Sequence, residues 1–152
     1  MEIKEEFVKT IVDKTMSSLS EDRRDKAAEF LFQHLYIRND KECQNQLDSI
    51  TGGGYDYLIL CHKIFVQHSL IEMKDAGFSY YQWLGGACTV KGHNRMDGKI
   101  CCLEEDDTYY VRGPKKTPKK KERLKGMPKG SPVDCNERCN CSVACFDPEI
   151  YW

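Results

Sequence analysis

The chain has 152 residues, of which 31% are charged and 11% aromatic, enough for one ordinary domain or two very small ones and too apolar for wholesale disorder. No apolar run approaches 18 residues, so we expect no membrane-spanning helix. The formal net charge of −1 conceals two opposed blocks, because residues 112–129 hold nine Lys and Arg against a single acid, Glu122. A basic segment with a role separate from the acidic remainder is therefore expected.

The first half of the sequence predicts helices. Apolar residues recur every three or four positions over residues 3–16, which is typical of one buried helix face. A second helix is expected after a serine cap, Ser18 or Ser20, and a third over residues 41–50 that ends at the glycines 52–54. Residues 55–74 are ambiguous because their short apolar run also suits a buried strand, but the length of the segment favours a helix.

From residue 78 onward the pattern changes to short strands and loops. Residues 78–84 are aromatic and predict a strand, residues 97–98 a tight turn, and residues 108–111 a second short strand. We therefore predict an α+β protein with a helical domain over residues 1–77 and a small, irregular, zinc-stapled region over residues 78–152. Few large apolar side chains lie in that region, so we expect metal ligation to offset the entropy of ordering it.

Nine cysteines carry the clearest chemical signal. The acidic start of the chain lacks an apolar signal segment, so we expect a reducing compartment in which thiols bind metal. The last four cysteines form C-x3-C-x-C-x3-C, a spacing that matches neither a helix face nor a strand face. It predicts a tightly coiled loop whose sulfurs converge on one tetrahedral zinc ion, with the ligands Cys135, Cys139, Cys141 and Cys145.

A second set of soft ligands lies upstream, formed by Cys88, His93, Cys101 and Cys102. Because adjacent cysteines point in different directions, the last two can serve different ions, or one can be a bystander. Cys43 and Cys61 fall in helical segments, where cysteine usually behaves as a small buried hydrophobe. His62 and His68 are interpreted as helix-surface or core histidines.

The basic segment, residues 112–132, is a Lys- and Pro-rich loop with three interpretations. It can be a solvated linker, a nuclear import signal, or an arm that contacts phosphates. It contains no aromatic residue, which favours electrostatic contact over base stacking. The candidate contact residues are Lys115, Lys116, Lys119, Lys120, Lys121, Arg123 and Lys125.

Residues 132–145, with Cys135-Asn136, Cys139, Cys141 and Cys145, resemble the second half of a pre-SET module. That module is the cysteine-rich zinc cluster preceding the catalytic domain of heterochromatin-type histone lysine methyltransferases, and a looser likeness extends back to residue 78. In that family nine cysteines hold three zinc ions, whereas this region has seven cysteines. Phe146-Asp147-Pro148 stands where the catalytic fold would follow. The resemblance implies a nuclear, chromatin-associated zinc module without methyl-transfer activity.

A second resemblance rests on residues 85–88 (Gly-Gly-Ala-Cys), His93, Cys101 and the pair Tyr110-Val111. It is to the small two-zinc cofactor protein of nidovirus replicases, a non-catalytic activator of RNA-processing enzymes. There one zinc is held by three cysteines and a histidine, and the other by four cysteines. A cysteine-rich RNA-binding effector is the third interpretation.

All three interpretations share most of their expectations. We expect two or three zinc ions, no enzymatic activity and no membrane association. We also expect a protein partner for the helical half and nucleic acid or an import receptor at the basic loop. The expected location is nuclear, with the cytoplasm as the alternative.

Overall fold

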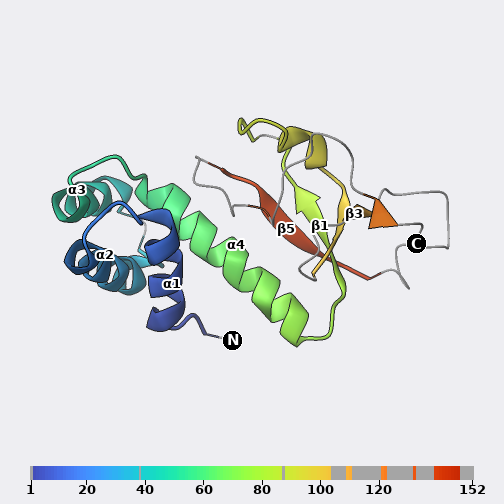
Figure 1. The fold of residues 1–152 in the computed structure, drawn as a ribbon, viewed down its shortest axis with the longest axis horizontal. Coiled ribbons are helices and arrows are strands. Elements are labelled where there is room, and N and C mark those ends of the chain that lie inside the picture. The colour runs from blue at the N-terminus through green and yellow to red at the C-terminus, as the bar shows by residue number, and fades with distance from the viewer. Residues whose placement is uncertain are drawn as a thin grey trace. The chain divides into compact units, whose positions relative to one another are not determined.

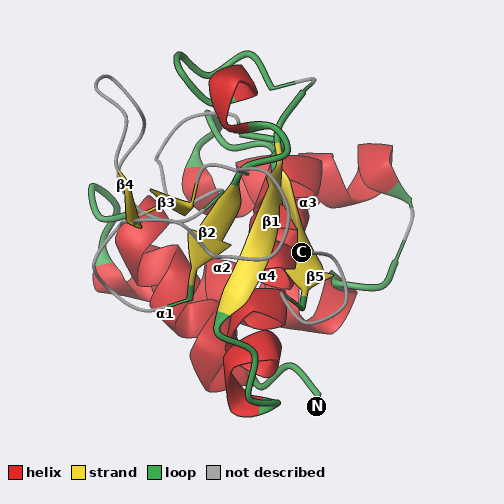
Figure 2. Cartoon of the chain, turned by 90° about the vertical axis from the view of Figure 1, so that its right-hand side faces the viewer, coloured by secondary structure: helices red, strands yellow, loops and turns green. Residues whose placement is uncertain are grey.

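A computed structural model of the chain describes residues 2–37, 39–86, 88–103, 109–110, 121–122, 132 and 139–147. The helices are α1 (Glu5–Thr15), α2 (Glu21–His34), α3 (Asp40–Thr51), α4 (Tyr57–Asp75) and the short η1 (Asn94–Met96). The strands are β1 (Tyr80–Leu84), β2 (Ile100–Cys102), β3 (Tyr109–Tyr110), β4 (Lys121–Glu122) and β5 (Ser142–Phe146) (Figures 1 and 2). The predicted α+β class is confirmed. Among the described residues, no helix combines the length and apolar character needed to cross a membrane.

Local chemistry sets the ends of the helices. The Ser20 hydroxyl accepts a hydrogen bond from the Arg23 amide at 3.3 Å and caps α2, which decides between the two serines that the sequence offered. The Asn39 side chain caps α3 in the same way. Gly52 ends α3 in the left-handed conformation, at φ 86°, which glycine adopts without steric cost.

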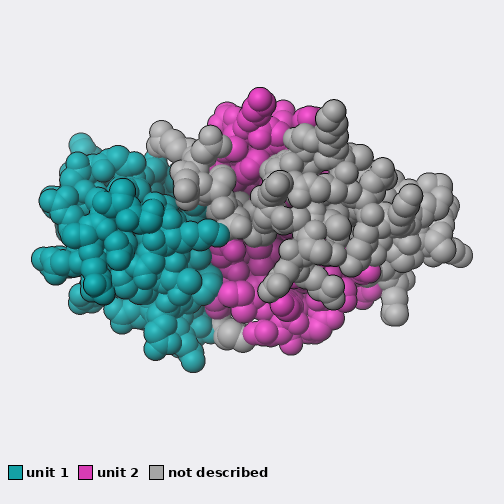
Figure 3. Space-filling model, in the orientation of Figure 1, with its two compact units in different colours: residues 1–64 teal, residues 65–152 magenta. Residues whose placement is uncertain are grey.

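Residues 1–64 form one compact unit and residues 65–152 another (Figure 3). The first unit contains α1 to α3 and the start of α4, and its buried apolar residues include Val8, Val12, Leu31 and Leu47. Val8 and Val12 lie on the apolar helix face that the sequence pattern predicts for residues 3–16.

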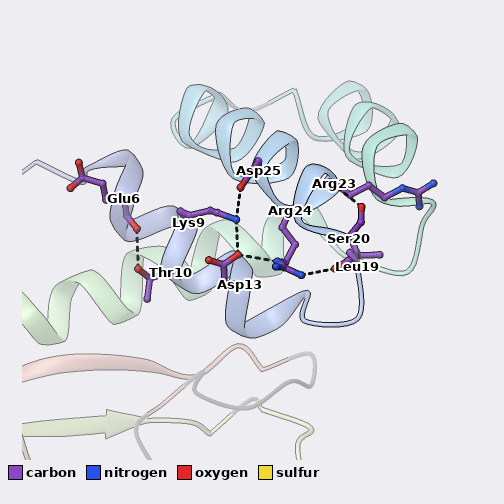
Figure 4. Close-up of polar contacts among 9 residues, drawn as sticks. All are labelled: Glu6, Lys9, Thr10, Asp13, Leu19, Ser20, Arg23, Arg24 and Asp25. Atoms are coloured by element: carbon purple, nitrogen blue, oxygen red, sulfur yellow. Dashed lines mark hydrogen bonds and ion pairs between the residues drawn. The ribbon is translucent and has the colours of Figure 1, made fainter.

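An ion-pair network joins α1 to α2 in the first unit (Figure 4). The Lys9 ammonium lies 2.6 Å from one carboxylate oxygen of Asp13 and 2.5 Å from one of Asp25. The Arg24 guanidinium reaches the same Asp13 oxygen at 3.0 Å. Hydrogen bonding from Lys9 is the largest cause of a lowered pKa at Asp13, which burial partly opposes and to which Arg24 adds.

The second unit is built on a five-stranded antiparallel sheet in the order β4-β3-β2-β1-β5, which Figure 2 shows face on. Successive side chains of a strand point to opposite faces of the sheet. The strand register therefore divides the buried side chains into two layers, one on each face. One layer holds Tyr81 and Trp83 with Cys101. The other holds Ile100, Cys102 and Phe146, with Tyr80 packed against them.

The second half of α4 belongs to the core of this second unit. Val66, Leu70 and Met73 recur at intervals of four and three residues and share a buried cluster with Tyr81 and Trp83. The compact units therefore divide between residues 64 and 65, inside α4. The sequence pattern instead predicts the boundary after Gly77, just beyond the end of that helix.

Candidate metal centre

The loop between β1 and β2, residues 85–98, supplies the first two ligands. Its base is closed by two backbone hydrogen bonds, from the Trp83 amide to the Lys99 carbonyl at 2.9 Å and from the Gly98 amide to the Trp83 carbonyl at 2.7 Å. The Asp97 carboxylate accepts a hydrogen bond from the Gly85 amide at 3.1 Å. These contacts fold the loop back on itself, although it contains little regular structure.

Turns within the loop bury Cys88 and His93. The Cys88 amide donates to the Gly85 carbonyl at 3.1 Å, and the His93 amide donates to the Val90 carbonyl at 3.0 Å. Between them Gly92 has a φ of 86°, which only glycine adopts readily. As a result, the two side chains are 6% and 5% exposed. A polar histidine at this depth needs a partner.

Cys139 and Cys141 provide the partners from the other end of the second unit. Cys141 directly precedes β5, whose register sets Ser142 opposite Leu84 of β1. That pairing places Cys141 beside Gly85, and a Cβ built on this glycine would lie 3.0 Å from the Cys141 sulfur. Both cysteines are fully buried. The pairing of β5 with β1 therefore brings Cys139 and Cys141 close to Cys88 and His93.

The four donor atoms, three sulfurs and the His93 Nδ1, all lie within 4.8 Å of one another. The Cys88 and Cys139 sulfurs are 3.8 Å apart. The His93 Nδ1 lies 3.7, 3.2 and 3.5 Å from the sulfurs of Cys88, Cys139 and Cys141. A tetrahedral zinc ion with ordinary bond lengths requires sulfur–sulfur separations of about 3.8 Å and sulfur–nitrogen separations of about 3.6 Å.

These separations fit a metal ion and do not fit a disulfide. A disulfide brings two sulfurs to about 2.05 Å, whereas the cysteines here are free thiols. Three cysteines and one histidine form a common closed ligand set for structural zinc. The cluster can thus hold a metal ion, and its donors are compatible with zinc.

Trp83 and Gly85 complete the wall of the site. The indole ring of Trp83 meets the imidazole of His93 edge to face, with 5.5 Å between ring centroids and an interplanar angle of 83°. A Cβ on Gly85 would lie 2.8 Å from the His93 carbonyl oxygen and 2.9 Å from the Trp83 Nε1. The backbone here approaches the ligands so closely that no side chain fits at residue 85.

The structure takes half of each predicted ligand set and joins the halves into one site. Cys88 and His93 come from the upstream set, and Cys139 and Cys141 from the terminal set. Cys135 lies outside the described residues. The structure does not bring the remaining three cysteines into this cluster.

Cys101 and Cys102 lie in β2 rather than at the site. Cys101 sits in the buried core with Tyr81, and burial, the largest effect, raises the pKa of its thiol to about 12. Cys102 belongs to the opposite layer, with Ile100 and Phe146. Adjacent strand residues face opposite ways, so the sequence expectation that these two cysteines diverge agrees with the structure.

Cys145 lies within strand β5 and is exposed, whereas Cys141 directly precedes that strand. Four residues of strand span about 13 Å, which is too far for both sulfurs to reach one ion. Cys141 and Cys145 therefore do not share one coiled loop. Val143 and Phe146 are residue types that favour strands, and this local preference is the sequence signal for β5.

The other singled-out residues are placed as follows. Cys43 and Cys61 are buried, as expected for small hydrophobes, and burial is the largest cause of the raised pKa of Cys61, about 11. His68 is buried, with its Nδ1 2.7 Å from a carboxylate oxygen of Glu72. The side chains of the seven candidate contact residues in the basic loop lie outside the described residues, which include within that loop only the backbone of Lys121 and Glu122 and the buried Pro132.

Comparison with models of known protein families, with curated proteins and with solved structures finds no match. The two resemblances noted in the sequence therefore stay predictions.

Proposed function

We propose that this chain is a non-catalytic zinc-binding protein in which the Cys88, His93, Cys139 and Cys141 cluster holds a structural ion. The observation that carries the proposal is the agreement between the donor separations and those of tetrahedral zinc. Four buried protein donors complete the coordination of zinc. A catalytic zinc instead keeps one position for water or substrate and uses three protein ligands.

The proposed ion acts as a cross-link within the second unit. His93 and Cys139 are 46 residues apart in the sequence, so binding one ion closes a long segment that includes β2, β3 and β4. Structural zinc sites in small modules contribute roughly 10 kcal/mol or more to folding. That contribution would stabilise the pairing of β5 with β1 and, with it, the surface of the second unit.

The biological role we propose is a nuclear interaction module associated with chromatin or nucleic acid. Its support is the basic run of residues 112–129, with nine Lys and Arg against one acid, together with the pre-SET resemblance. Contacts of lysine with phosphate weaken steeply as salt rises. Binding to nucleic acid should therefore fall between two salt concentrations, and fall further when Lys119, Lys120 and Lys121 are changed to Ala.

The second candidate is a viral-type cofactor that activates a partner RNA-processing enzyme. One specific observation favours it, because the cluster contains three cysteines and one histidine, the donor set of one zinc site in that family. Stimulation of a partner enzyme, with weak RNA binding by the chain alone, would distinguish it from a chromatin module. Binding to double-stranded RNA without any partner would favour an RNA-binding effector.

Native mass spectrometry combined with thiol alkylation tests the metal site. The purified full chain should carry zinc that a strong chelator removes. Zinc should protect the thiols of Cys88, Cys139 and Cys141 from alkylation, whereas the exposed Cys145 should react with or without the ion. Cys101 should react slowly in both states because its raised pKa, about 12, leaves little thiolate at neutral pH.

Two results would overturn the metal site. One is an unchanged mass after chelation, which would mean that no ion is bound. The other is zinc-dependent protection of Cys145 in place of Cys141, which would favour a terminal four-cysteine site over the cluster in the structure.

A further inference from the structure

Trp83 carries an unpaired hydrogen-bond donor at the wall of the metal site. Its side chain is fully buried. Among the described residues, its indole Nε1 is the buried side-chain nitrogen or oxygen atom that has no hydrogen-bond partner. A buried donor without a partner costs on the order of 1–3 kcal/mol, so such an atom requires an explanation.

The position of this donor relative to the ligands supplies the explanation. A Cβ on Gly85 would lie 2.9 Å from the Trp83 Nε1 and 3.0 Å from the Cys141 sulfur. The two atoms thus border the same small space, which is open because residue 85 has no side chain. The His93 carbonyl oxygen also borders it, but that oxygen already accepts the Met96 amide at 3.0 Å.

Metal binding changes what Cys141 can accept. A neutral thiol is a weak hydrogen-bond acceptor, whereas a metal-bound cysteine is a thiolate and accepts strongly. Zinc with three thiolates and a neutral histidine has a net charge of −1, and a buried charge needs nearby donors to offset its desolvation. An indole N–H directed at the thiolate offsets part of that charge.

We infer that Trp83 is a positioning residue of the metal site, whose indole N–H donates to the Cys141 thiolate when the ion is bound. This inference rests on the proposed zinc function and deepens it. The donor stays unpaired in the free-thiol form and is satisfied in the loaded form. Trp83 thereby favours the loaded state, as outer-shell hydrogen bonds do at other metal sites.

The substitution Trp83→Phe tests the inference because it keeps an aromatic ring and removes the N–H. We expect zinc affinity, measured by competition with a chelating dye, to fall by about 10-fold or more. In the cobalt-substituted full chain the thiolate-to-metal charge-transfer band should shift to lower energy, because a thiolate without its hydrogen bond gives up an electron more readily. Loss of packing alone would not move this band.

Tyr81→Phe is the matched control, since it removes a hydroxyl from the neighbouring buried aromatic of β1. It should leave the affinity and the cobalt band unchanged. If Trp83→Phe does not fold, a tryptophan isostere with sulfur in place of the ring N–H, introduced in a Trp152→Phe background, keeps the shape and removes only the donor.

Two outcomes separate this inference from the zinc function itself. Wild-type protein that binds zinc, with unchanged affinity and band after loss of the N–H, would overturn the role of Trp83 alone. Wild-type protein that binds neither zinc nor cobalt would overturn both.

Discussion

Removal of the two distal ligands should release the ion and detach β5. The double substitution Cys139→Ser and Cys141→Ser keeps the side chains small and leaves only two donors, Cys88 and His93. Two donors do not hold zinc at a structural site. The variant therefore loses the cross-link between the 85–98 loop and the segment before β5, while every other described contact of the sheet remains possible.

The size of the effect follows from the length of the segment that the ion closes. His93 and Cys139 are 46 residues apart, and for a cross-link of that span the chain-entropy treatment gives about 4 kcal/mol at 25 °C. Metal–ligand bonding adds to this figure, so it is a lower bound for the loaded protein. It is nevertheless a large fraction of the 5–15 kcal/mol that keeps an ordinary domain folded.

Hydrogen exchange measured by mass spectrometry is the assay. Strands β5 and β1 are in register from Tyr80↔Phe146 to Leu84↔Ser142, and the amides that bond across this pair should be protected in the zinc-loaded protein. A loss of about 4 kcal/mol corresponds to exchange about a thousandfold faster. Amides of α1 and α2, in the first unit, should change little.

Cys145→Ser is the control, because Cys145 lies on the same strand but is exposed. It should keep both the zinc and the protection. Unchanged zinc content in the double variant would refute the assignment of the ligands. Lost zinc with unchanged exchange in β5 would show that the strand holds its place without the ion, and would refute the cross-link argument.

Two further predictions concern the glycine at the site and the charges of the first unit. Gly85→Ala should lower zinc affinity by at least about 10-fold, because the added Cβ would lie 2.8–3.0 Å from the His93 carbonyl oxygen, the Trp83 indole nitrogen and the Cys141 sulfur. Gly86→Ala should cost far less in the same dye competition, because the atoms nearest to its Cβ all belong to the Asp97 side chain, the first at 3.1 Å. Asp13 has a lowered pKa in the folded chain, so its contribution to stability is present above its ordinary pKa and is lost as pH falls through the folded value. Asp13→Asn should therefore flatten the acid limb of the unfolding free energy, with a loss at neutral pH of under about 1 kcal/mol; an unchanged acid limb in chemical denaturation would contradict the ion-pair network.

Local sequence patterns predict the helices of the first half and the types of donor at the site. Helix faces follow from local periodicity, and Ser20 and Gly52 act on neighbouring backbone atoms, so both can be read without tertiary information. The soft donors Cys88, His93, Cys139 and Cys141 are all candidate ligands on sequence grounds, because residue type alone carries that chemistry.

Which donors meet depends on contacts between distant segments of the chain. Spacing along the chain favoured grouping the four terminal cysteines, but pairing of β5 with β1 extends the backbone and carries Cys145 away from Cys141. The same pairing brings Cys141 to Gly85, and so to a loop that lies about fifty residues earlier in the chain. Strand register is fixed by cross-strand packing and hydrogen bonds between distant segments, and no local pattern in the sequence records that information.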